Sequence, residues 1–367
     1  MTMDGLDGVV VAETRLSDVD GERGRLVIRG HDVEALAERA DFEAVCALLW
    51  HGALPGERAH LALRTALGLA RLRAFARLPT LGDALETRDG MEALRAALAH
   101  LRASEISPAE LRVELTAAVA VFASAWACVQ RGAAPVAPDP ALGHAADYLR
   151  MSSPHGSDPS RSCALDAYLV TAADHGMNAS TFTARVVAST DSDTVSAVVA
   201  ALGALKGPRH GGAPGPVLAM LDEICEPSNA PAWIAAELSA GRRIMGMGHR
   251  IYRVRDPRAA VLERAVERLR ETGLRSDRLD LARAVEHVAV SSLGERRPER
   301  RMGANVEFYT AVLLDAIGLP QALFSPTFAV ARVAGWLAHI DEQRESSRII
   351  RPSSRYVGPM PEAHAAA

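Results

Sequence analysis

Aromatic residues, cysteines and long apolar runs are all scarce in this sequence. Aromatic side chains make up 4% of the 367 residues, which argues against an extensive β-sheet because strands favour aromatic and β-branched residues. The four cysteines are scattered and form no C-x-x-C pair, so the sequence argues against a disulfide framework or a zinc site. The longest uncharged stretch, which starts at Leu115, falls short of the roughly 20 residues needed to span a bilayer, and we expect it to be a buried helix.

The N-terminal residues and the charge balance argue against further classes of protein. The first residues lack the basic region and apolar core of a signal peptide, so we expect a soluble, cytoplasmic protein. The 41 basic and 45 acidic residues give a net charge of −4, which argues against a surface made for nucleic acid. Any anion-binding site must therefore be a local concentration of arginine. The sequence also contains no P-loop, no glycine fingerprint after a strand and no repeat period.

Most of the chain instead shows helical periodicity. Apolar residues alternate only around Asp20 and Gly21, where we expect a small β-hairpin. Beyond this hairpin, apolar residues recur at helical intervals, which predicts an almost all-α fold. In the last long helix we expect Ser325 to be the N-cap and Pro326 to occupy the first helical position. A chain of 367 residues is longer than one hydrophobic core usually spans, so we expect one large and one smaller domain.

Three histidines stand where the predicted helices break, each beside a glycine: His175, His210 and His249. A single histidine at a helix end is more often structural, but glycines let the backbone approach a ligand closely. Three such histidines together therefore indicate a binding site. His210 also precedes a predicted helix that starts near Pro214. The dipole of that helix would keep the imidazole neutral, so that its N–H can donate to a developing oxyanion.

Two charged residues interrupt apolar helical stretches. Arg332 has no acidic residue one helical turn away, so its partner is either a distant part of the protein or a ligand. Glu307 lies at a predicted helix start, where it either complements the helix dipole or is a general base held ionised in an apolar wall. Arg351 is a weaker candidate for ligand binding, because arginines near a C-terminus are usually solvated. The basic run at 294–301 is either a surface loop or a phosphate site.

Seven stretches of the sequence, in this order, resemble the citrate synthase family. They are "GLDGVVVAETRLSDVDGERGRLVIRG", "ADHGMNASTFTARVVAST", "GPRHGGAPGPVL", "MGMGHRIYRVRDPRA", "NVEFYTAVLLDAIG", "FAVARVAGWLAHIDEQ" and "IRPSSRYVGP". The resemblance covers nearly the whole chain, and the shared order makes it specific. It implies an almost all-helical homodimer with a large domain at 1–211 and 310–367 and a small domain at 212–309 that closes over the substrates. It also implies condensation of acetyl-CoA with oxaloacetate to give citrate and CoA, with no metal and no cofactor.

The resemblance assigns the residues at the reacting atoms. His210 matches the family histidine that hydrogen-bonds the thioester oxygen of acetyl-CoA as the enol or enolate forms. His249 matches the histidine on the carbonyl of oxaloacetate, and Phe328 matches an aromatic residue packed against the condensing centre. Glu307 falls where most members have the aspartate that removes the methyl proton. A carboxylate and a neutral donor on opposite sides of one small group are what this proton transfer requires.

The resemblance also assigns the residues that bind the substrates. His175 matches a further contact to oxaloacetate. Arg258, Arg332 and Arg351 match the arginines that bind the carboxylates of oxaloacetate, with Arg351 reaching in from the other subunit. Arg253 matches a ligand of the CoA phosphates. Paired arginines suit this dianionic substrate because each guanidinium both binds and orients a carboxylate.

Two departures from the family pattern leave alternatives open. Glu307 is one methylene longer than the usual aspartate, and a displacement of about 1 Å can cost on the order of a hundredfold in rate. A weakly catalytic paralogue that binds metabolites is therefore one alternative. A 2-methylcitrate synthase acting on propionyl-CoA is the other, because one methylene in an apolar pocket is worth only ~1–3 kcal/mol. The chain also lacks the extra N-terminal domain of NADH-regulated members, so we expect no inhibition by NADH.

Overall fold

The computed structural model describes residues 4–6, 8–103, 106–211, 214–273, 277–296, 302–346 and 348–359. Within these ranges the chain forms fifteen α-helices and three short strands, so the predicted all-α fold is confirmed. The α-helices are α1 (Val33–Arg39), α2 (Phe42–His51), α3 (Glu57–Ala76), α4 (Gly90–Ala99), α5 (Pro108–Gln130), α6 (His144–Ser152), α7 (Pro159–Ala172), α8 (Ala179–Ala188), α9 (Thr194–Leu205), α10 (Pro214–Ile224), α11 (Ala230–Ser239), α12 (Pro257–Glu271), α13 (Asp277–Arg296), α14 (Val306–Ala316) and α15 (Phe324–Ser346). Short 3₁₀ turns lie at η1 (Asp4–Leu6), η2 (Leu78–Thr80), η4 (Pro227–Asn229) and η5 (Gln321–Leu323).

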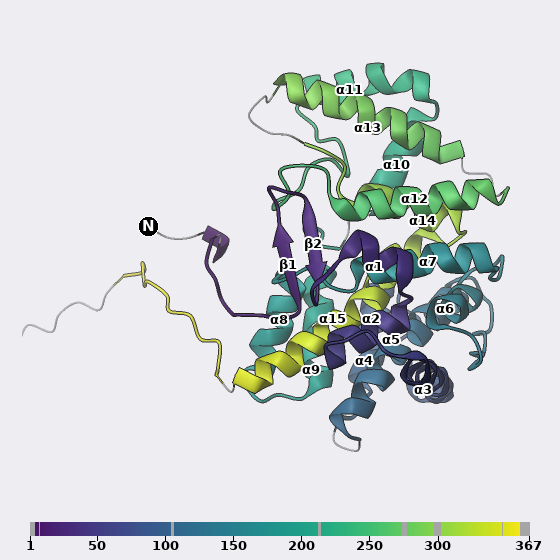
Figure 1. Ribbon diagram of the computed structural model, residues 1–367, viewed down its shortest axis with the longest axis vertical. Helices are drawn as coiled ribbons and strands as arrows, with labels where there is room; N and C mark the ends of the chain where they lie inside the picture. The colour runs from purple at the N-terminus through teal and green to yellow at the C-terminus, as the bar shows by residue number, and fades with distance from the viewer. Residues whose placement is uncertain are drawn as a thin grey trace, which may run out of the picture.

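The predicted hairpin is present, with one more strand than expected. Strands β1 (Ser17–Asp20) and β2 (Arg25–Ile28) pair antiparallel. A third strand, β3 (His31–Asp32), pairs with the end of β2. Two residues are too short to show an alternating pattern, so the sequence could not reveal β3. The hairpin stands along one side of the helical body and points its tip towards α12 and the segment before it (Figure 1).

Helix α5 lies in the centre of the larger body of helices. Its residues from Leu115 to Cys128 are all buried, and it packs against α3, α4, α6 and α15. Among the described residues it is the one helix long and apolar enough to cross a membrane. Its burial by neighbouring helices fits the predicted role as a core helix. Gly90 at the start of α4 allows close packing here, because a Cβ at that position would lie 2.7 Å from the Trp126 ring.

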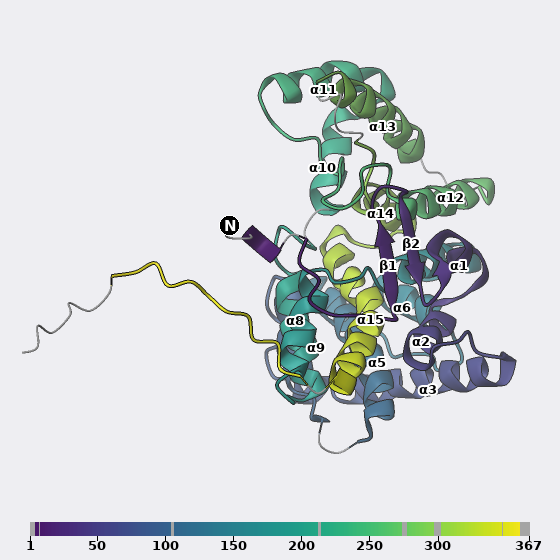
Figure 2. The same ribbon diagram turned by 60° about the vertical axis from the view of Figure 1, so that its left-hand side comes forward.

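Helices α10 to α14 gather at one end of the molecule, above the body made by α1–α9 and α15 (Figures 1 and 2). Helix α12 joins the two parts, since it packs against α14 on one side and against α7 and α1 on the other. The domain boundary expected after residue 211 falls just before α10. The one expected after residue 309 falls inside α14. The division into two domains at these positions stays a prediction.

Helix α15 begins earlier than the sequence predicted. It starts at Phe324, so the prediction of Ser325 as N-cap and Pro326 as first helical residue was wrong. The reason is that the 3₁₀ turn η5 runs directly into the helix. Pro326 is tolerated within the first turn because the first four N–H groups of a helix have no partner in the helix. The Ser325 hydroxyl donates instead to the carbonyl of Gly211 at 2.7 Å.

Candidate active site

The Gly-Met-Gly segment before His249 pairs with the segment before Glu307. Gly248 donates its N–H to the Gly303 carbonyl at 2.9 Å, and Asn305 donates to the Gly246 carbonyl at 2.9 Å. Gly246 has a φ of +73°, and a Cβ there would lie 2.8 Å from the Phe308 side chain, so this close approach requires glycine. The pairing holds His249 and Glu307 on neighbouring backbone segments although they are far apart in the sequence.

Asp256 holds this arrangement together through its hydrogen bonds. Its carboxylate accepts hydrogen bonds from Arg258 Nη2 at 2.7 Å and Nε at 3.0 Å. It also accepts the N–H of Arg258 at the start of α12 and the N–H of Val306 at the start of α14. Asp256 is therefore the shared anchor of two helix starts and one buried guanidinium. The sequence reasoning missed this role, although an aspartate directly before a helix-starting proline is an N-cap signal.

His249 is held as a neutral hydrogen-bond donor. Its Nδ1 accepts the backbone N–H groups of Ile251 and Tyr252, each at 3.1 Å. In a neutral imidazole the proton is then on Nε2. Burial, reinforced by the positive charge of Arg258, lowers the pKa of His249 to about 4. The Nε2–H is therefore present and uncharged at neutral pH.

His210 is also neutral, with the opposite tautomer. Its Nε2 accepts the backbone N–H of Ser180 at 3.3 Å and lies 2.8 Å from the Ser180 hydroxyl, so the proton is on Nδ1. Burial, with a further contribution from Arg332, lowers the pKa of His210 to about 4. Ser180 is in the first turn of α8, whose N-cap is Asn178. The helix start that His210 contacts is thus that of α8, whereas the sequence pointed to the helix starting at Pro214.

His175 lies beside these groups and is buried, with 6% of its surface exposed. Its ring is 5.6 Å from the His249 ring, and its Nε2 is 3.1 Å from the Tyr252 hydroxyl. Burial, followed by the charges of Arg258 and Arg332, lowers its pKa well below the usual value. Tyr252 contacts both histidine rings, and the sequence reasoning did not single it out.

Arg332 is buried in α15 with few protein partners. Its Nε donates to the Ala172 carbonyl at 2.7 Å, and its guanidinium carbon lies 4.7 Å from the Phe328 ring centre. The same Phe328 ring is 6.2 Å from the His210 ring. Within the described residues no carboxylate forms an ion pair with Arg332, and Asp174 acts on it only at longer range. Burial accordingly lowers the pKa of Arg332 to about 10.

Glu307 is the second residue of α14, half-buried, with its backbone N–H bonded to the Asn305 side chain at 3.0 Å. Burial raises the pKa of Glu307 to about 7, opposed by Arg258 and increased further by Asp256. The expected carboxylate at a helix start is therefore present. A base with a pKa raised to about 7 suits proton abstraction near pH 7.

These groups form one connected site. The charge of Arg258 acts on His175, His249 and Glu307, and that of Arg332 acts on both His175 and His210. Of the residues predicted from the sequence, the structure thus brings together all but two.

The two exceptions are Arg253 and Arg351. The side chain of Arg253 is 53% exposed, and its Nε lies 3.9 Å from the Glu22 carboxylate near the hairpin tip. Arg351 is exposed in the extended segment 348–359, which runs away from the body of the molecule (Figures 1 and 2). Residues 297–301 of the basic run lie outside the described residues, so its role stays open.

Comparison with known proteins identifies the family of the chain. The family described as "Citrate synthase, C-terminal domain" matches residues 5–353. The citrate synthase of Haloferax volcanii is 39% identical over 369 residues, covering 96% of this chain and 95% of that protein. The crystal structure of citrate synthase from Pyrobaculum aerophilum superposes with a TM-score of 0.87 at 32% identity, covering 99% of this chain and 94% of that one.

A third relative was solved with bound ligands. The citrate synthase of Thermoplasma acidophilum, in ternary complex with carboxymethyl coenzyme A and oxaloacetate, superposes with a TM-score of 0.86 at 26% identity, covering 99% of this chain and 97% of that one. The family model matches nearly the full length of the chain, and relatives are more than 30% identical to it. The chain belongs to the citrate synthase family and is an acyltransferase of that family.

Proposed function

We propose that this enzyme condenses acetyl-CoA with oxaloacetate and hydrolyses the resulting citryl-CoA to citrate and CoA. The observations that carry the proposal are two neutral imidazoles with opposite tautomers and a glutamate of pKa about 7. The charge of Arg258 acts on both His249 and Glu307. One imidazole offers Nδ1–H and the other Nε2–H. Such an arrangement stabilises two developing oxyanions without donating a full proton before it is needed.

In the first step Glu307 removes a proton from the methyl carbon of acetyl-CoA. The electron pair moves onto the thioester oxygen, where His210 donates its Nδ1–H. His210 suits this role because its Nε2 is bonded to the start of α8 and its pKa is about 4. We assign Phe328 a place beside the reacting carbon, because its ring lies near both His210 and Arg332.

In the second step the enolate carbon attacks the ketone carbon of oxaloacetate. His249 donates its Nε2–H to the ketone oxygen, which takes the negative charge as the new bond forms. Arg258 and Arg332 bind the carboxylates of oxaloacetate, and His175 contacts the same substrate. The buried Arg332 supports this assignment, because its planar donors lack a protein carboxylate among the described residues. Water then attacks the thioester carbonyl and CoA leaves as the thiol.

The remaining assignments concern the wider assembly. We propose that Arg253 binds a CoA phosphate, which its exposed side chain allows. We propose a cytoplasmic homodimer in which Arg351 completes the site of the partner, which the extended position of residues 348–359 supports. We further propose that residues 212–309 close over the substrates and that the reaction uses neither a metal nor a cofactor. Closure would exclude water until citryl-CoA has formed.

The two alternatives are less well supported. The relatives named above are described as citrate synthases, so a 2-methylcitrate synthase is not favoured. A metabolite-binding paralogue would not need His210 held as an uncharged donor facing the site. A backbone of α14 that lies slightly further from the substrate than in members with aspartate would bring the longer Glu307 side chain to the same carboxylate position.

The deciding experiment measures CoA release with acetyl-CoA and with propionyl-CoA, each with and without oxaloacetate. We expect release that depends on oxaloacetate and is faster with acetyl-CoA. Glu307→Gln should lower kcat by about 10²–10⁴-fold, the usual contribution of a general base. The matched control is Glu43→Gln, because Glu43 is also a buried carboxylate but lies in α2 away from the site. Retention of most of the turnover by Glu307→Gln would remove Glu307 from the mechanism.

A further inference from the structure

One face of α15 carries four buried polar side chains. Arg332, Trp336, His339 and Gln343 are at most 4% exposed. Their spacing of four, three and four residues places them in one row along the helix. The row faces the chain that runs from the end of α7 through the loop to α8. Only its first member, Arg332, has a role in the proposed reaction.

The first three members of this row bond to a segment that carries a site histidine or leads to one. Arg332 donates to the Ala172 carbonyl at the end of α7. Trp336 donates its indole N–H to the Ser180 hydroxyl at 3.1 Å, and Ser180 in turn contacts His210. His339 lies with Nε2 3.1 Å from Asp174 Oδ1. The row therefore fixes the backbone on both sides of the α7–α8 loop.

The loop sits directly on this face because of a glycine in α15. A Cβ at Gly335 would lie 2.3 Å from the Ala173 carbonyl oxygen and 2.7 Å from Asp174 Oδ1. Any larger residue would push the loop away from the helix. Gly335 thus allows Asp174, which is fully buried, to reach His339.

His175 is bracketed by two residues that share one partner. Asp174 accepts a hydrogen bond from the Ser17 hydroxyl through its Oδ2. Gly176 donates its N–H to the same Ser17 oxygen at 2.9 Å. Ser17 is the first residue of β1, so the hairpin and α15 hold the loop from opposite sides. The residues before and after His175 are tied down, while the imidazole itself points to Tyr252.

The orientation of His339 is set by an arginine on its other side. Arg185 of α8 lies with Nη1 3.0 Å from His339 Nδ1. Because a guanidinium only donates, Nδ1 accepts, and the proton of the neutral ring is on Nε2, facing Asp174. Arg185 also donates to Glu342 at 2.7 Å and to Gln343 at 2.9 Å. Both ring nitrogens of His339 therefore have a partner, and the two partners fix the orientation of the ring.

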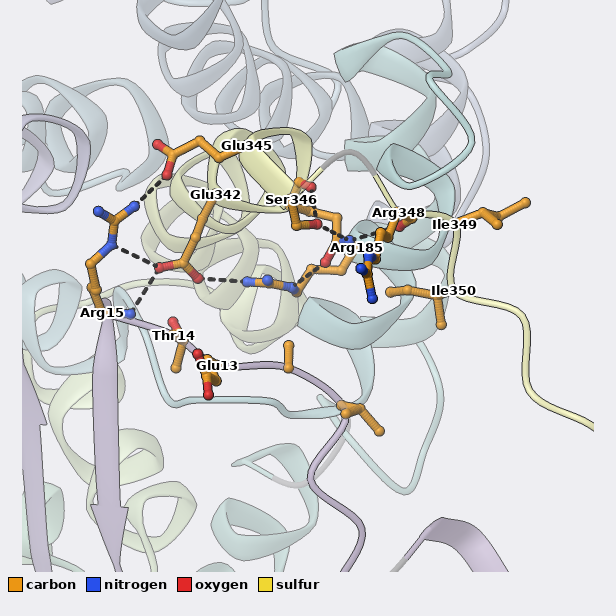
Figure 3. A pocket seen from close by; sticks show the side chains of 13 residues that line it. Glu13, Thr14, Arg15, Arg185, Glu342, Glu345, Ser346, Arg348, Ile349 and Ile350 are labelled. Carbon is orange, nitrogen blue, oxygen red and sulfur yellow. Dashed lines mark hydrogen bonds and ion pairs between the residues drawn. The ribbon is translucent and has the colours of Figure 1, made fainter.

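The network ends at a cavity of about 880 Å³ beside the C-terminal end of α15 (Figure 3). Arg185 and Glu342 line it, together with residues 11–15 of the N-terminal segment and residues 348–350. Glu342 accepts the backbone N–H of Arg15 at 2.8 Å. The chain of contacts thus ties the segment leading into β1 to the same helix that holds the loop.

We propose that Ser17, Asp174 and His339 are positioning residues that hold His175 in place to bind oxaloacetate. This inference rests on the proposed function, in which His175 contacts that substrate. None of the three side chains needs to touch the substrate. They act by fixing the backbone at positions 174 and 176, so their loss affects the affinity for oxaloacetate more than the affinity for the acyl donor.

The test is direct binding of oxaloacetate alone by isothermal titration calorimetry, together with the KM of each substrate. His339→Ala should raise the Kd and KM of oxaloacetate by about 10- to 100-fold, as expected for a misplacement of the order of 1 Å. The KM of acetyl-CoA should change by less than ~3-fold, because a loop shift at His175 leaves the acyl-donor contacts in place. His339→Gln keeps an acceptor and a donor and should recover most of the affinity. Ser17→Ala, which removes only a hydroxyl, should show a smaller shift in the same direction and serves if His339→Ala does not fold.

The matched control is His144→Ala. His144 is equally buried, and its Nδ1 also lies near an arginine, 3.5 Å from Arg71 Nη1. Its other contacts are with Glu43 and Phe42, which are not site residues. This variant should lose thermal stability and keep the oxaloacetate Kd. An unchanged Kd in folded His339→Ala, or an equal increase in His144→Ala, overturns the inference. Wild-type protein that binds no oxaloacetate overturns the proposed function as well, whereas turnover surviving Glu307→Gln would overturn only the assignment of the base.

Discussion

Arg71 and Arg332 are both completely enclosed guanidiniums, yet their surroundings differ. Arg71 in α3 donates from Nε to Asp147 at 2.7 Å and from Nη2 to the Leu142 carbonyl at 2.8 Å, with a further bond to the Asp139 carbonyl. Its charge is matched by a carboxylate that is itself fully buried. Arg332 makes one bond, to the Ala172 carbonyl, and forms no ion pair within the described part of the chain. Burial of charge alone therefore does not identify a site, and what distinguishes Arg332 from Arg71 is the lack of a carboxylate paired with it among the described residues.

The carboxylates in the structural region around Arg71 and in the candidate site around Arg332 differ in the same way. Glu43 in α2 is 2% exposed and accepts the N–H of His144 at 2.8 Å. Asp166 in α7 accepts the N–H of Phe42 at 2.8 Å. Glu307 is half-buried, and its carboxylate accepts no hydrogen bond from the described residues. Burial raises the pKa of all three, but only Glu307 has its oxygens available to a substrate.

The sharpest way to test this comparison is Arg332→Met. Loss of one partner from a buried, hydrogen-bonded charge pair costs about 2–5 kcal/mol, which corresponds to roughly a 30- to 5,000-fold fall in kcat/KM. We expect this fall to appear for oxaloacetate in steady-state kinetics. The thermal midpoint should stay the same or rise, because the substitution removes a charge without a protein counterion. A large drop in stability with little change in kcat/KM would place Arg332 among the structural residues.

The matching substitution in the other region, Arg71→Met, should lower stability and leave kcat/KM unchanged. It leaves Asp147 buried with only Arg150 as a charged partner, at 2.7 Å. Breaking a buried pair in this way lowers the free energy of unfolding by about 3 kcal/mol. Denaturant unfolding measures that loss, and kcat/KM of the folded protein should remain at the wild-type value. If Arg71→Met instead weakened oxaloacetate binding, the two regions would not be independent.

The contrast also explains what the sequence revealed. Arg332 was identified from the sequence because the apolar residues around it left no local counterion. Arg71 was not singled out from the sequence, in which Arg73 and Arg77 follow it closely. The same local logic found the three histidines and Glu307, whose neighbouring glycines and helix starts are visible in the chain itself.

Contacts between distant segments could not be predicted in this way. Ser180 lies 30 residues from His210, and its hydroxyl contacts both His210 and the indole N–H of Trp336 in α15. The contact of His210 with the start of α8 could therefore not be read from the sequence. Tyr252 and Asp256 were missed for a related reason, since their importance depends on the pairing of residues 246–248 with 303–305. The fold class followed from periodicity, but these pairings follow from packing.

The pH dependence provides a smaller and more selective test of the same contrast. Glu307 acts as a base only when ionised, so kcat/KM for acetyl-CoA should rise with pH through an apparent pKa of about 7. Below that value it should fall by about tenfold per pH unit. His210 and His249, with pKa values of about 4, stay neutral across this range and add no second transition above pH 5. A profile flat from pH 5.5 to 8 would contradict the role of Glu307.

Stability should change with pH in the opposite direction. Burial raises the pKa of Glu43, Asp166 and Glu307 above their values in the unfolded chain, so the folded state holds protons that the unfolded state has released. Their contribution to stability is therefore complete below about pH 4 and is lost as the pH rises through the folded pKa values. Glu43→Gln keeps an acceptor for the His144 N–H, removes one of these titrations and should make the unfolding free energy less dependent on pH. The midpoint of the kcat/KM profile should not move, because Glu43 belongs to the region whose hydrogen bonds are closed within the protein. A shift of that midpoint by Glu43→Gln would mean that the two groups of carboxylates titrate together and that the structural and the reactive regions are coupled.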